Sequence, residues 1–349
     1  MCDTRMTLFK TISAVLLVGA YVYFAATQYW ILSTRSPVRI ELHGNGIEIP
    51  SFGLGTWLSD EDKVAHAVEF ALESGYNHVD AALIYKNEKE TGKGILAANL
   101  PRDKLWVTSK LWNADHRPKE ATIAVQKSAK DLGVHYLDLY LMHWPVAFVP
   151  GKDTKIDEST TIVDTWRVME DIARSNLTRK IGISNFSKRD VEMILEICQI
   201  CPYAHEFETH PYLQQQEFVD WHKEIGIKVI AYSPLANTNP VYKDKQKLDP
   251  ILKDPLWIDL AKKKNGTVAQ TILAWGLQRN TVVIPKSVQE KHILENLGAL
   301  DIKFTEEEML EISMHDKKTR MNDPGRGWGV KLFADLDDPT QLDGDEDEL

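Results

Sequence analysis

Short apolar runs alternate with longer amphipathic segments through most of this chain. A strand that is followed each time by a helix predicts parallel pairing, because the helix carries the chain back across the sheet. Eight such units with right-handed crossovers close into an α/β fold, the (β/α)8 TIM barrel. The expected strands are Gly53–Thr56, Val79–Ala82, Leu105–Ser109, Leu137–Met142, Ile181–Ser184, Ala204–Glu208, Val229–Tyr232 and Val282–Ile284.

The segments between these strands show helical periodicity. A ninth helix is expected near Thr305–Met314, where Thr305 and Glu308 have the spacing of a capping box. The segment Val146–Thr160 is longer than most barrel loops and is expected to form part of a lid. The other expected helices are Asp62–Ser74, Glu88–Ala98, Pro118–Leu132, Ile162–Ser175, Lys188–Ile197, Gln215–Ile225, Val268–Gln278 and Lys291–Leu297.

Three consecutive apolar strands each carry one polar group near the carboxyl end. These groups are Asp80, Lys110 and His143, and Tyr85 follows Asp80 where the chain leaves its strand. A buried carboxylate is costly unless a partner compensates its charge. Polar groups at successive strand ends are typical of the active face of a barrel. For any one of them alone, a buried Asp–Lys pair or a satisfied core histidine is the ordinary interpretation.

The four residues in their local contexts resemble the catalytic tetrad of the aldo-keto reductases, and the similarity extends from about Val38 to about Asp316. The resemblance implies NADP-dependent, reversible reduction of aldehydes and ketones to alcohols, an alditol:NADP+ 1-oxidoreductase type of activity. Tyr85 is then the general acid, with a pKa lowered toward neutrality by Lys110, which Asp80 holds in place. His143 donates the hydrogen bond that orients the carbonyl oxygen.

No glycine-rich dinucleotide fingerprint opens a helix, so a Rossmann site is not indicated. The resemblance implies instead that NADPH, with NADH as the alternative, lies across the carboxyl ends of the strands. The nicotinamide carboxamide is then held by Ser184 and Asn185, and the ring stacks on Tyr232. The remaining implied contacts are Gly55 and Thr56 at the first strand end, Ser233 and Leu235 at the pyrophosphate, Lys286, Ser287 and Val288 at the 2′-phosphate, and Glu295 and Asn296 at the adenine.

Two residues depart from the family pattern. Glu206 stands beside the carboxamide where relatives usually have Gln; it lacks the amide donor and adds a charge, so binding is expected to weaken or become pH-dependent. His292 stands where relatives that prefer NADPH usually have Arg, and a mostly neutral imidazole is a weaker phosphate partner. NADPH remains the expected cofactor, with a reduced margin over NADH.

Tryptophans follow three of the strand ends and are expected to wall a substrate pocket. Trp57, Trp112 and Trp144 hold these positions, and Trp328 is expected to cap the pocket from the C-terminal loop. Aromatic walls favour carbonyl compounds with apolar faces. Core packing is the alternative for any single tryptophan.

A second function remains open, in which the barrel binds the nicotinamide cofactor as a non-catalytic regulatory sensor. A barrel hydrolase is more distant, because it needs metal ligands or paired carboxylates at strand ends and the sequence indicates neither. No metal site is expected. The formal net charge of −10 argues against nucleic-acid binding, and a monomer is expected.

The ends of the chain suggest membrane attachment. Thr11–Leu32 has no charged residue and is long enough to span a bilayer, so we expect one transmembrane helix, with a cleaved signal peptide as the alternative. The ending Glu346-Asp347-Glu348-Leu349 resembles an endoplasmic-reticulum retrieval signal, although a solvated acidic tail explains it equally well. Together they predict a lumenal barrel anchored in that membrane; a cytosol-facing barrel is the alternative.

Three parts of the chain are expected. They are an anchor and linker (1–37), the barrel (38–320) and a C-terminal loop with an acidic tail (321–349). A β-hairpin over Val38–Ile49, centred on Gly44-Asn45-Gly46, is expected to plug the barrel bottom. Cys198 and Cys201 have CxxC spacing at a helix end and are expected to be structural or incidental thiols, joined only in an oxidising lumen.

Overall fold

The computed structural model describes residues 48–337, apart from 153, 240, 242–247 and 334. Eight strands pair in parallel in chain order, and all pairs are between neighbours in the sequence. The ring closes between the last and first strands, where the amide of Gly53 donates to the Val283 carbonyl at 2.9 Å and the amide of Val283 donates to the Ser51 carbonyl at 2.9 Å. The strands are β1 (Leu54–Gly55), β2 (His78–Asp80), β3 (Trp106–Leu111), β4 (Leu137–Met142), β5 (Thr178–Ser184), β6 (Ala204–Glu208), β7 (Lys228–Tyr232) and β8 (Val282–Val283).

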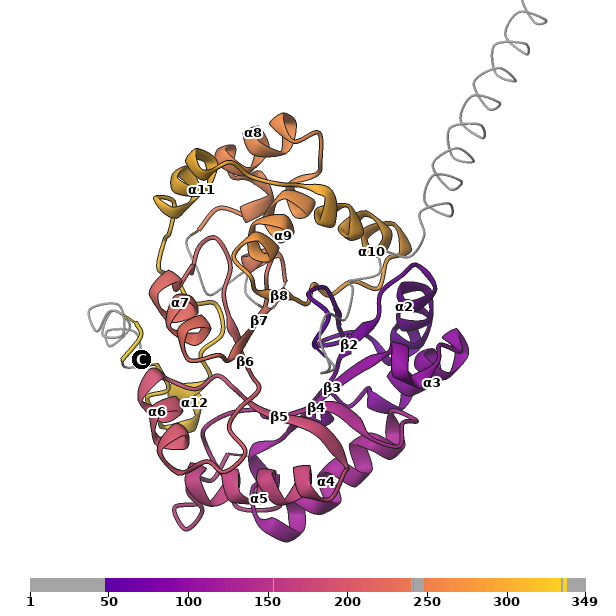
Figure 1. The fold of residues 1–349 in the computed structure, drawn as a ribbon, viewed down its shortest axis with the longest axis vertical. Helices are drawn as coiled ribbons and strands as arrows, with labels where there is room; N and C mark the ends of the chain where they lie inside the picture. The colour runs from indigo at the N-terminus through magenta and orange to yellow at the C-terminus, as the bar shows by residue number, and fades with distance from the viewer. Residues whose placement is uncertain (1–47, 153, 240, 242–247, 334, 338–349) are drawn as a thin grey trace, which may run out of the picture. The chain divides into compact units, whose positions relative to one another are not determined.

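The helices surround this ring, as Figure 1 shows down the barrel. Four helices begin with a complete capping box: α5 at Thr161, α6 at Ser187, α9 at Thr267 and α11 at Thr305. The helices are α2 (Glu61–Glu73), α3 (Glu88–Ala98), α4 (Pro118–Asp131), α5 (Ile162–Arg174), α6 (Lys188–Ile197), α7 (Gln216–Glu224), α8 (Pro255–Lys263), α9 (Val268–Gln278), α10 (Glu290–Asn296), α11 (Glu306–Ser313) and α12 (Gly325–Trp328).

The eight-stranded parallel barrel predicted from the alternation is confirmed. The structure adds α8, which the sequence analysis did not identify. Its start has recognisable chemistry, because the Asp254 side chain accepts from the Leu256 amide and Pro255 occupies the first turn. The described part of the connection between β7 and β8 therefore contains two α-helices, α8 and α9, where one was expected.

Alternation along the strands separates two cores. Residues of one parity face the helices and form the large core between strands and helices. Those of the other parity fill the barrel interior with an apolar cluster that includes Trp106, Leu139, Leu141, Ala204 and Ile230. Nearer the carboxyl ends of the strands, the inward-facing positions carry polar residues instead of apolar ones. The polar site therefore lies inside the barrel, next to this apolar cluster.

The N-terminal predictions require a correction. No helix within the described residues is long and apolar enough to cross a membrane. Thr11–Leu32 and most of the Val38–Ile49 hairpin lie outside the described residues. The expected transmembrane helix, membrane attachment and endoplasmic-reticulum location are therefore unsupported and are withdrawn. The physical reason is that an uncharged apolar run is shared by several kinds of segment and does not establish a span by itself. The boundaries at 37/38 and 320/321 remain predictions.

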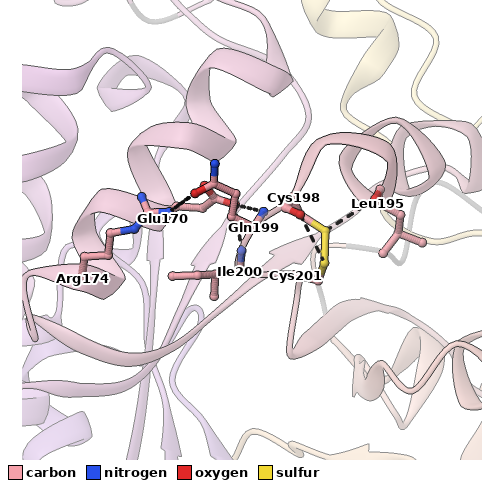
Figure 2. The surroundings of a disulfide bond; sticks show 7 residues. All are labelled: Glu170, Arg174, Leu195, Cys198, Gln199, Ile200 and Cys201. Carbon is pink, nitrogen blue, oxygen red and sulfur yellow. Dashed lines mark hydrogen bonds and ion pairs between the residues drawn. A yellow bond between two sulfur atoms is a disulfide. The ribbon is translucent and has the colours of Figure 1, made fainter.

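A disulfide joins Cys198 and Cys201 in the connection from α6 to β6, where separate thiols had been expected (Figure 2). The same turn is held from α5, because the Glu170 carboxylate accepts from the amides of Gln199 at 2.6 Å and Ile200 at 2.9 Å. The guanidinium of Arg174 in turn donates to the Gln199 side chain. This connection is thus fixed by hydrogen bonds as well as by the disulfide.

Candidate active site

A buried charge cluster lies inside the barrel, above the apolar layer. The Lys110 ammonium donates to Asp80 Oδ1 at 2.5 Å and to the Ala81 carbonyl at 3.1 Å, and it lies 3.3 Å from Glu206 Oε1. Lys110 has no exposed surface, and Asp80 and Glu206 are each 2% exposed. Burial lowers the pKa of Lys110, but the two carboxyl groups outweigh it and raise that pKa above its usual value. Lys110 is therefore held as a cation.

Tyr85 lies beside this cation at the end of the short turn η1 (Leu83–Tyr85). The Lys110 nitrogen is 5.2 Å from the centre of the Tyr85 ring. Burial raises the pKa of Tyr85 well above its ordinary value; Lys110 opposes this, and Asp80 and Glu206 add to it. The sequence analysis expected this pKa to be lowered toward neutrality, which is wrong for this structure because burial and two carboxyl groups exceed the effect of one ammonium. Tyr85 keeps its proton at neutral pH.

The His143 ring lies against Tyr85, with ring centres 5.8 Å apart, and against Trp112 at 5.4 Å. Burial, followed by the charge of Lys110, holds the pKa of His143 well below its usual range, so the ring is neutral. Its Nδ1 has no hydrogen-bond partner within the described residues. A neutral imidazole carries one N–H, which suits it to donate a hydrogen bond rather than to supply a charge.

Glu206 completes a pair of carboxyl groups around Lys110. Asp80 reaches the centre from β2 and Glu206 from β6, so the pair crosses the barrel interior. Burial and then the Asp80 charge raise the pKa of Glu206 well above its usual value, while Lys110 opposes them. The sequence analysis indicated no paired carboxylates at the strand ends. It missed this pair because residues distant in the chain face each other only after the barrel closes.

The cluster borders a cavity of 840 Å³ at the carboxyl ends of the strands, within the size range of small-molecule sites. Most residues singled out from the sequence line this cavity, whereas Lys110 lies behind it and Glu295 and Asn296 do not line it. The singled-out residues that line it are Gly55, Thr56, Trp57, Asp80, Tyr85, Trp112, His143, Trp144, Ser184, Asn185, Glu206, Tyr232, Ser233, Leu235, Lys286, Ser287, Val288, His292 and Trp328.

Asn185 is held in a left-handed backbone conformation at the end of β5, with φ of 62°. Its amide nitrogen donates to the His143 carbonyl and to Ser184 Oγ, both at 3.0 Å, and its amide oxygen accepts from the Tyr232 hydroxyl at 2.7 Å. The second lone pair of that oxygen remains for a ligand donor. Hydrogen bonds thus orient both Asn185 and the Tyr232 ring before any ligand binds.

The other end of the cavity is an exposed rim that contains Lys286, Ser287 and His292. Burial of part of the side chain lowers the pKa of Lys286; Asp60 opposes this and Lys63 adds to it. Lys63 pairs with Asp60 at 2.6 Å. Near the closure of the barrel, a Cβ on Gly55 would lie 2.8 Å from the Ile284 carbonyl oxygen, so only glycine permits β1 to approach β8 this closely.

Aromatic side chains form the remaining wall. The Trp328 ring in α12 lies edge to face with Trp144 at 5.1 Å, Phe148 at 5.3 Å and Trp112 at 6.2 Å. The expected contribution of Trp328 from the C-terminal loop thus agrees with the structure. Phe148 does not line the cavity but packs against Trp112 and Trp328. It was not foreseen, because nothing in its local sequence distinguishes it from other apolar loop residues.

Sequence reasoning also missed how the C-terminal loop is attached. The Glu208 carboxylate accepts from the amides of Met321 at 2.7 Å and Asn322 at 2.9 Å, and it pairs with His210 at 2.8 Å. Asn322 lines the cavity. The sequence did contain a clue: Glu206 and Glu208 lie two residues apart on one strand and therefore face the same side. Buried acids of this kind need specific partners, so contacts to other segments could have been predicted.

The donor set fits a nicotinamide cofactor. The Asn185 amide and Ser184 hydroxyl suit a carboxamide, the oriented Tyr232 suits a flat heterocycle, and Lys286 with Ser287 at the rim suits a phosphate. Within the described residues no group of three or more His, Cys, Asp or Glu side chains is arranged to hold a metal ion.

Comparisons with known proteins agree with this geometry. Residues 51–317 match the model of the aldo/keto reductase family. An uncharacterized oxidoreductase of Schizosaccharomyces pombe is 40% identical over 304 residues, covering 84% of this chain and 93% of the relative. Aldo-keto reductase family 1 member A1 of Pongo abelii is 39% identical over 289 residues, covering 79% and 88%.

Two solved structures share the fold. The aldose reductase of Schistosoma japonicum superposes with a TM-score of 0.76 at 35% identity, covering 85% of this chain and 98% of that one. An aldo-keto reductase of Bombyx mori in complex with NADP gives a TM-score of 0.77 at 33% identity, covering 83% and 96%.

Proposed function

This chain belongs to the aldo/keto reductase family, and we propose that it catalyses the reversible, NADPH-dependent reduction of aldehydes and ketones to alcohols. The observation that carries the proposal is the meeting of Tyr85, Lys110, Asp80 and His143 at one end of a cavity of ligand size. The same convergence argues against a purely regulatory nicotinamide sensor, which needs the cofactor contacts but not an acid positioned beside a buried cation.

The proposed proton donor is the Tyr85 hydroxyl. Because burial keeps the phenol protonated, it is in the correct form for reduction at neutral pH. As negative charge develops on the carbonyl oxygen, Tyr85 transfers its proton there, and the fixed charge of Lys110 stabilises the phenolate that remains. Asp80 holds Lys110 in position. His143, neutral and adjacent, donates a hydrogen bond that orients the carbonyl oxygen.

The proposed cofactor site uses the remaining cavity residues. A bound nicotinamide cofactor supplies the hydride. Ser184 and Asn185 orient its carboxamide, Tyr232 supports the ring, and Lys286 with Ser287 contacts the phosphate end. The Bombyx mori relative was solved with NADP, which supports a nicotinamide cofactor here. Because Lys286 supplies a cation and His292 replaces the usual arginine, we propose preference for NADPH with a small margin over NADH.

The proposed substrates have an apolar or aromatic face. Trp112, Trp144 and Trp328 place three ring surfaces around the mouth above Tyr85 and His143. Aromatic walls exclude water from the reacting carbonyl and strengthen the electrostatic effect of Lys110. Among the described residues, this part of the cavity wall holds no ionic partner for charged carbonyl compounds, which are therefore expected to bind less well.

The test is NADPH oxidation with a panel of aromatic and aliphatic aldehydes, using the wild-type protein and Tyr85→Phe. The substitution removes the proton donor and is expected to lower turnover by about 100-fold or more. Binding of NADPH, followed by fluorescence, is expected to be nearly unchanged, because the phenol is not among the proposed cofactor contacts. Retention of more than a few per cent of wild-type turnover would show that Tyr85 is not the acid. Tight NADPH binding without single-turnover oxidation in the wild type would favour the sensor.

A further inference from the structure

The buried cluster around Lys110 contains one ammonium and two carboxyl groups. Lys110 contacts Asp80 Oδ1 at 2.5 Å and Glu206 Oε1 at 3.3 Å. The second oxygens, Asp80 Oδ2 and Glu206 Oε2, are buried with no hydrogen-bond partner counted within the described residues. Two carboxylates and one ammonium carry an excess negative charge, which is costly at 2% exposure or less. A single additional proton neutralises the excess charge and gives one of the two unpaired oxygens a hydrogen to share.

We infer that Glu206 holds this proton and shares it with Asp80, and that it thereby sets the pH range over which Tyr85 retains its own proton. Asp80 makes the shorter contact with Lys110, so the negative charge belongs on Asp80 and the proton on Glu206. Burial and then the Asp80 charge raise the pKa of Glu206, in agreement with this assignment.

Within the described residues, no other proton acceptor near Glu206 competes for this proton. From β2 it faces Asp80, from β3 Lys110, and from η1 Tyr85. Ser184 and Ile230, its register neighbours on the adjacent strands, do not titrate in this range. Of the nearby imidazoles, burial lowers the pKa of His78 to about 4 and holds that of His143 well below its usual range, so both are neutral.

The inference concerns the proposed reductase activity and predicts a specific pH effect. While Glu206 is protonated, glutamine at position 206 has the same charge, so Glu206→Gln leaves the charge beside Tyr85 unchanged. Once Glu206 loses its proton, the wild type has one more negative charge beside Tyr85 than the variant. That charge resists formation of the Tyr85 phenolate. Tyr85 therefore loses its proton at lower pH in the variant.

The kinetic test compares pH profiles of kcat/KM for aldehyde reduction with NADPH and alcohol oxidation with NADP+. In Glu206→Gln, the high-pH loss of reduction and the onset of oxidation are expected to move to lower pH by about one unit or more. A merely structural role would lower rates at every pH without moving the profile. Superposable wild-type and variant profiles would overturn the inference.

Infrared spectroscopy tests the proton without turnover. The wild-type minus Glu206→Gln difference spectrum is expected to contain the carbonyl stretch of one protonated carboxylic acid at neutral pH. In Asp80→Asn, Glu206 alone remains beside Lys110, so it ionises and the band is expected to disappear. This second variant also serves if Glu206→Gln does not fold. A wild-type spectrum without the band would overturn the inference.

A matched control is Glu88→Gln, which removes a buried carboxyl group outside the site. Its own acid band is expected to vanish between about pH 6 and pH 8, since burial raises the pKa of Glu88 to about 7, while the Glu206 band persists. If the wild type reduces no carbonyl compound, the proposed function fails, but the spectra still decide where the proton lies.

Discussion

Strand β3 carries the partners of buried carboxyl groups on both of its faces. Lys110 points into the barrel and meets Asp80 and Glu206. Ser109, its neighbour, points outward, where its hydroxyl donates to Glu88 Oε1 at 2.5 Å. Ser128 on α4 donates to Glu88 Oε2 at 3.0 Å. Burial is similar on the two sides, but the inner carboxyl groups contact a buried cation, whereas the hydrogen bonds to Glu88 come from hydroxyl groups.

The difference separates two ways of tolerating a buried acid. Hydroxyl groups satisfy the carboxyl oxygens without cancelling the charge, so burial raises the pKa of Glu88 to about 7. On the inner face, Lys110 cancels one charge and leaves the other carboxyl group to be neutralised by a proton. The negative charge of Asp80 must persist throughout the proposed reaction, so it needs the Lys110 ammonium as its partner. Glu88 has no such role, so hydrogen bonds from hydroxyl groups are enough to keep it buried.

The largest effect is expected for Lys110→Met on the inner face. Loss of the cation leaves the Tyr85 phenolate uncompensated, so kcat/KM for reduction is expected to fall roughly 100- to 10,000-fold. Steady-state kinetics with a saturating cofactor measures this fall. Ser109→Ala, on the outer face of the same strand, is the matched control and is expected to retain activity. A Lys110→Met enzyme with more than a tenth of wild-type kcat/KM would contradict the comparison.

The same substitution is expected to make stability depend on pH. Without Lys110, the charge that opposes the effect of burial on Glu206 is lost, so Glu206 becomes a group whose folded pKa lies further above its unfolded value of about 4. Such groups contribute their stability fully below pH 4 and lose it as the pH rises through the folded pKa values. Urea unfolding between pH 4 and pH 8 is expected to show Lys110→Met falling increasingly below the wild type.

On the outer face, Glu88→Gln is expected to stabilise the protein at high pH. The folded pKa of Glu88 is about 7, against 4.5 for an ordinary glutamate, so its stabilising contribution is fully present below pH 4.5 and is lost as the pH rises through about 7. Glutamine does not titrate. The gain in unfolding free energy is therefore expected to grow from near zero at pH 4.5 to about 3 kcal/mol above pH 8. A gain that does not vary with pH would mean that Glu88 is not titrating in the folded state.

A smaller effect is expected at the exposed rim, because water and salt screen charges there more than at the buried sites on the two faces of β3. His292→Arg adds a fixed cation to the proposed phosphate site, and the ratio of NADH to NADPH dissociation constants is expected to rise about tenfold. The increase should shrink in high salt. Equal affinities for the two cofactors before and after the substitution would refute the proposed role of this rim.

The smallest effect is expected at the disulfide. Reduction, or replacement of Cys198 and Cys201 by serine, opens a very short loop whose turn is also held by Glu170. Stability is expected to fall by at most about 2 kcal/mol, with no change in kcat/KM. Thermal unfolding with and without a reductant measures the first, and the aldehyde assay measures the second. A loss of activity on reduction would show that this connection is coupled to the site.

The barrel could be predicted from the sequence because strand alternation and helix caps are local properties. β4, β6, α3, α6 and α9 were placed at their observed bounds. The start of β5 was predicted three residues late, at Ile181 instead of Thr178. The predictions were too long at β1 and β8, which are only two residues long and depend on each other for closure. Such strands carry little local signal, because their pairing partners are at opposite ends of the barrel.

At the site, residue identities were easier to predict than their electrostatics. Tyr85, Lys110 and His143 do lie together, but the direction of the Tyr85 pKa was predicted incorrectly. Local sequence reveals that a cation accompanies a phenol; it does not reveal how deeply both are buried or that Glu206 joins Asp80 from across the barrel. These are properties of the closed fold.

The segment that carries Trp328 is held at both of its ends. Arg320 and Asp337, 17 positions apart, are joined by two hydrogen bonds of 2.6 and 2.7 Å, while Glu208 fastens the adjoining backbone to β6. The segment between them is closed like an Ω-loop, and within it Asp335 also accepts from the Arg189 amide of α6 at 3.0 Å. We expect release of product past Trp328 to depend on the Arg320–Asp337 contact, so shortening the chain before Asp337 is expected to change the rate of release rather than the architecture of the barrel.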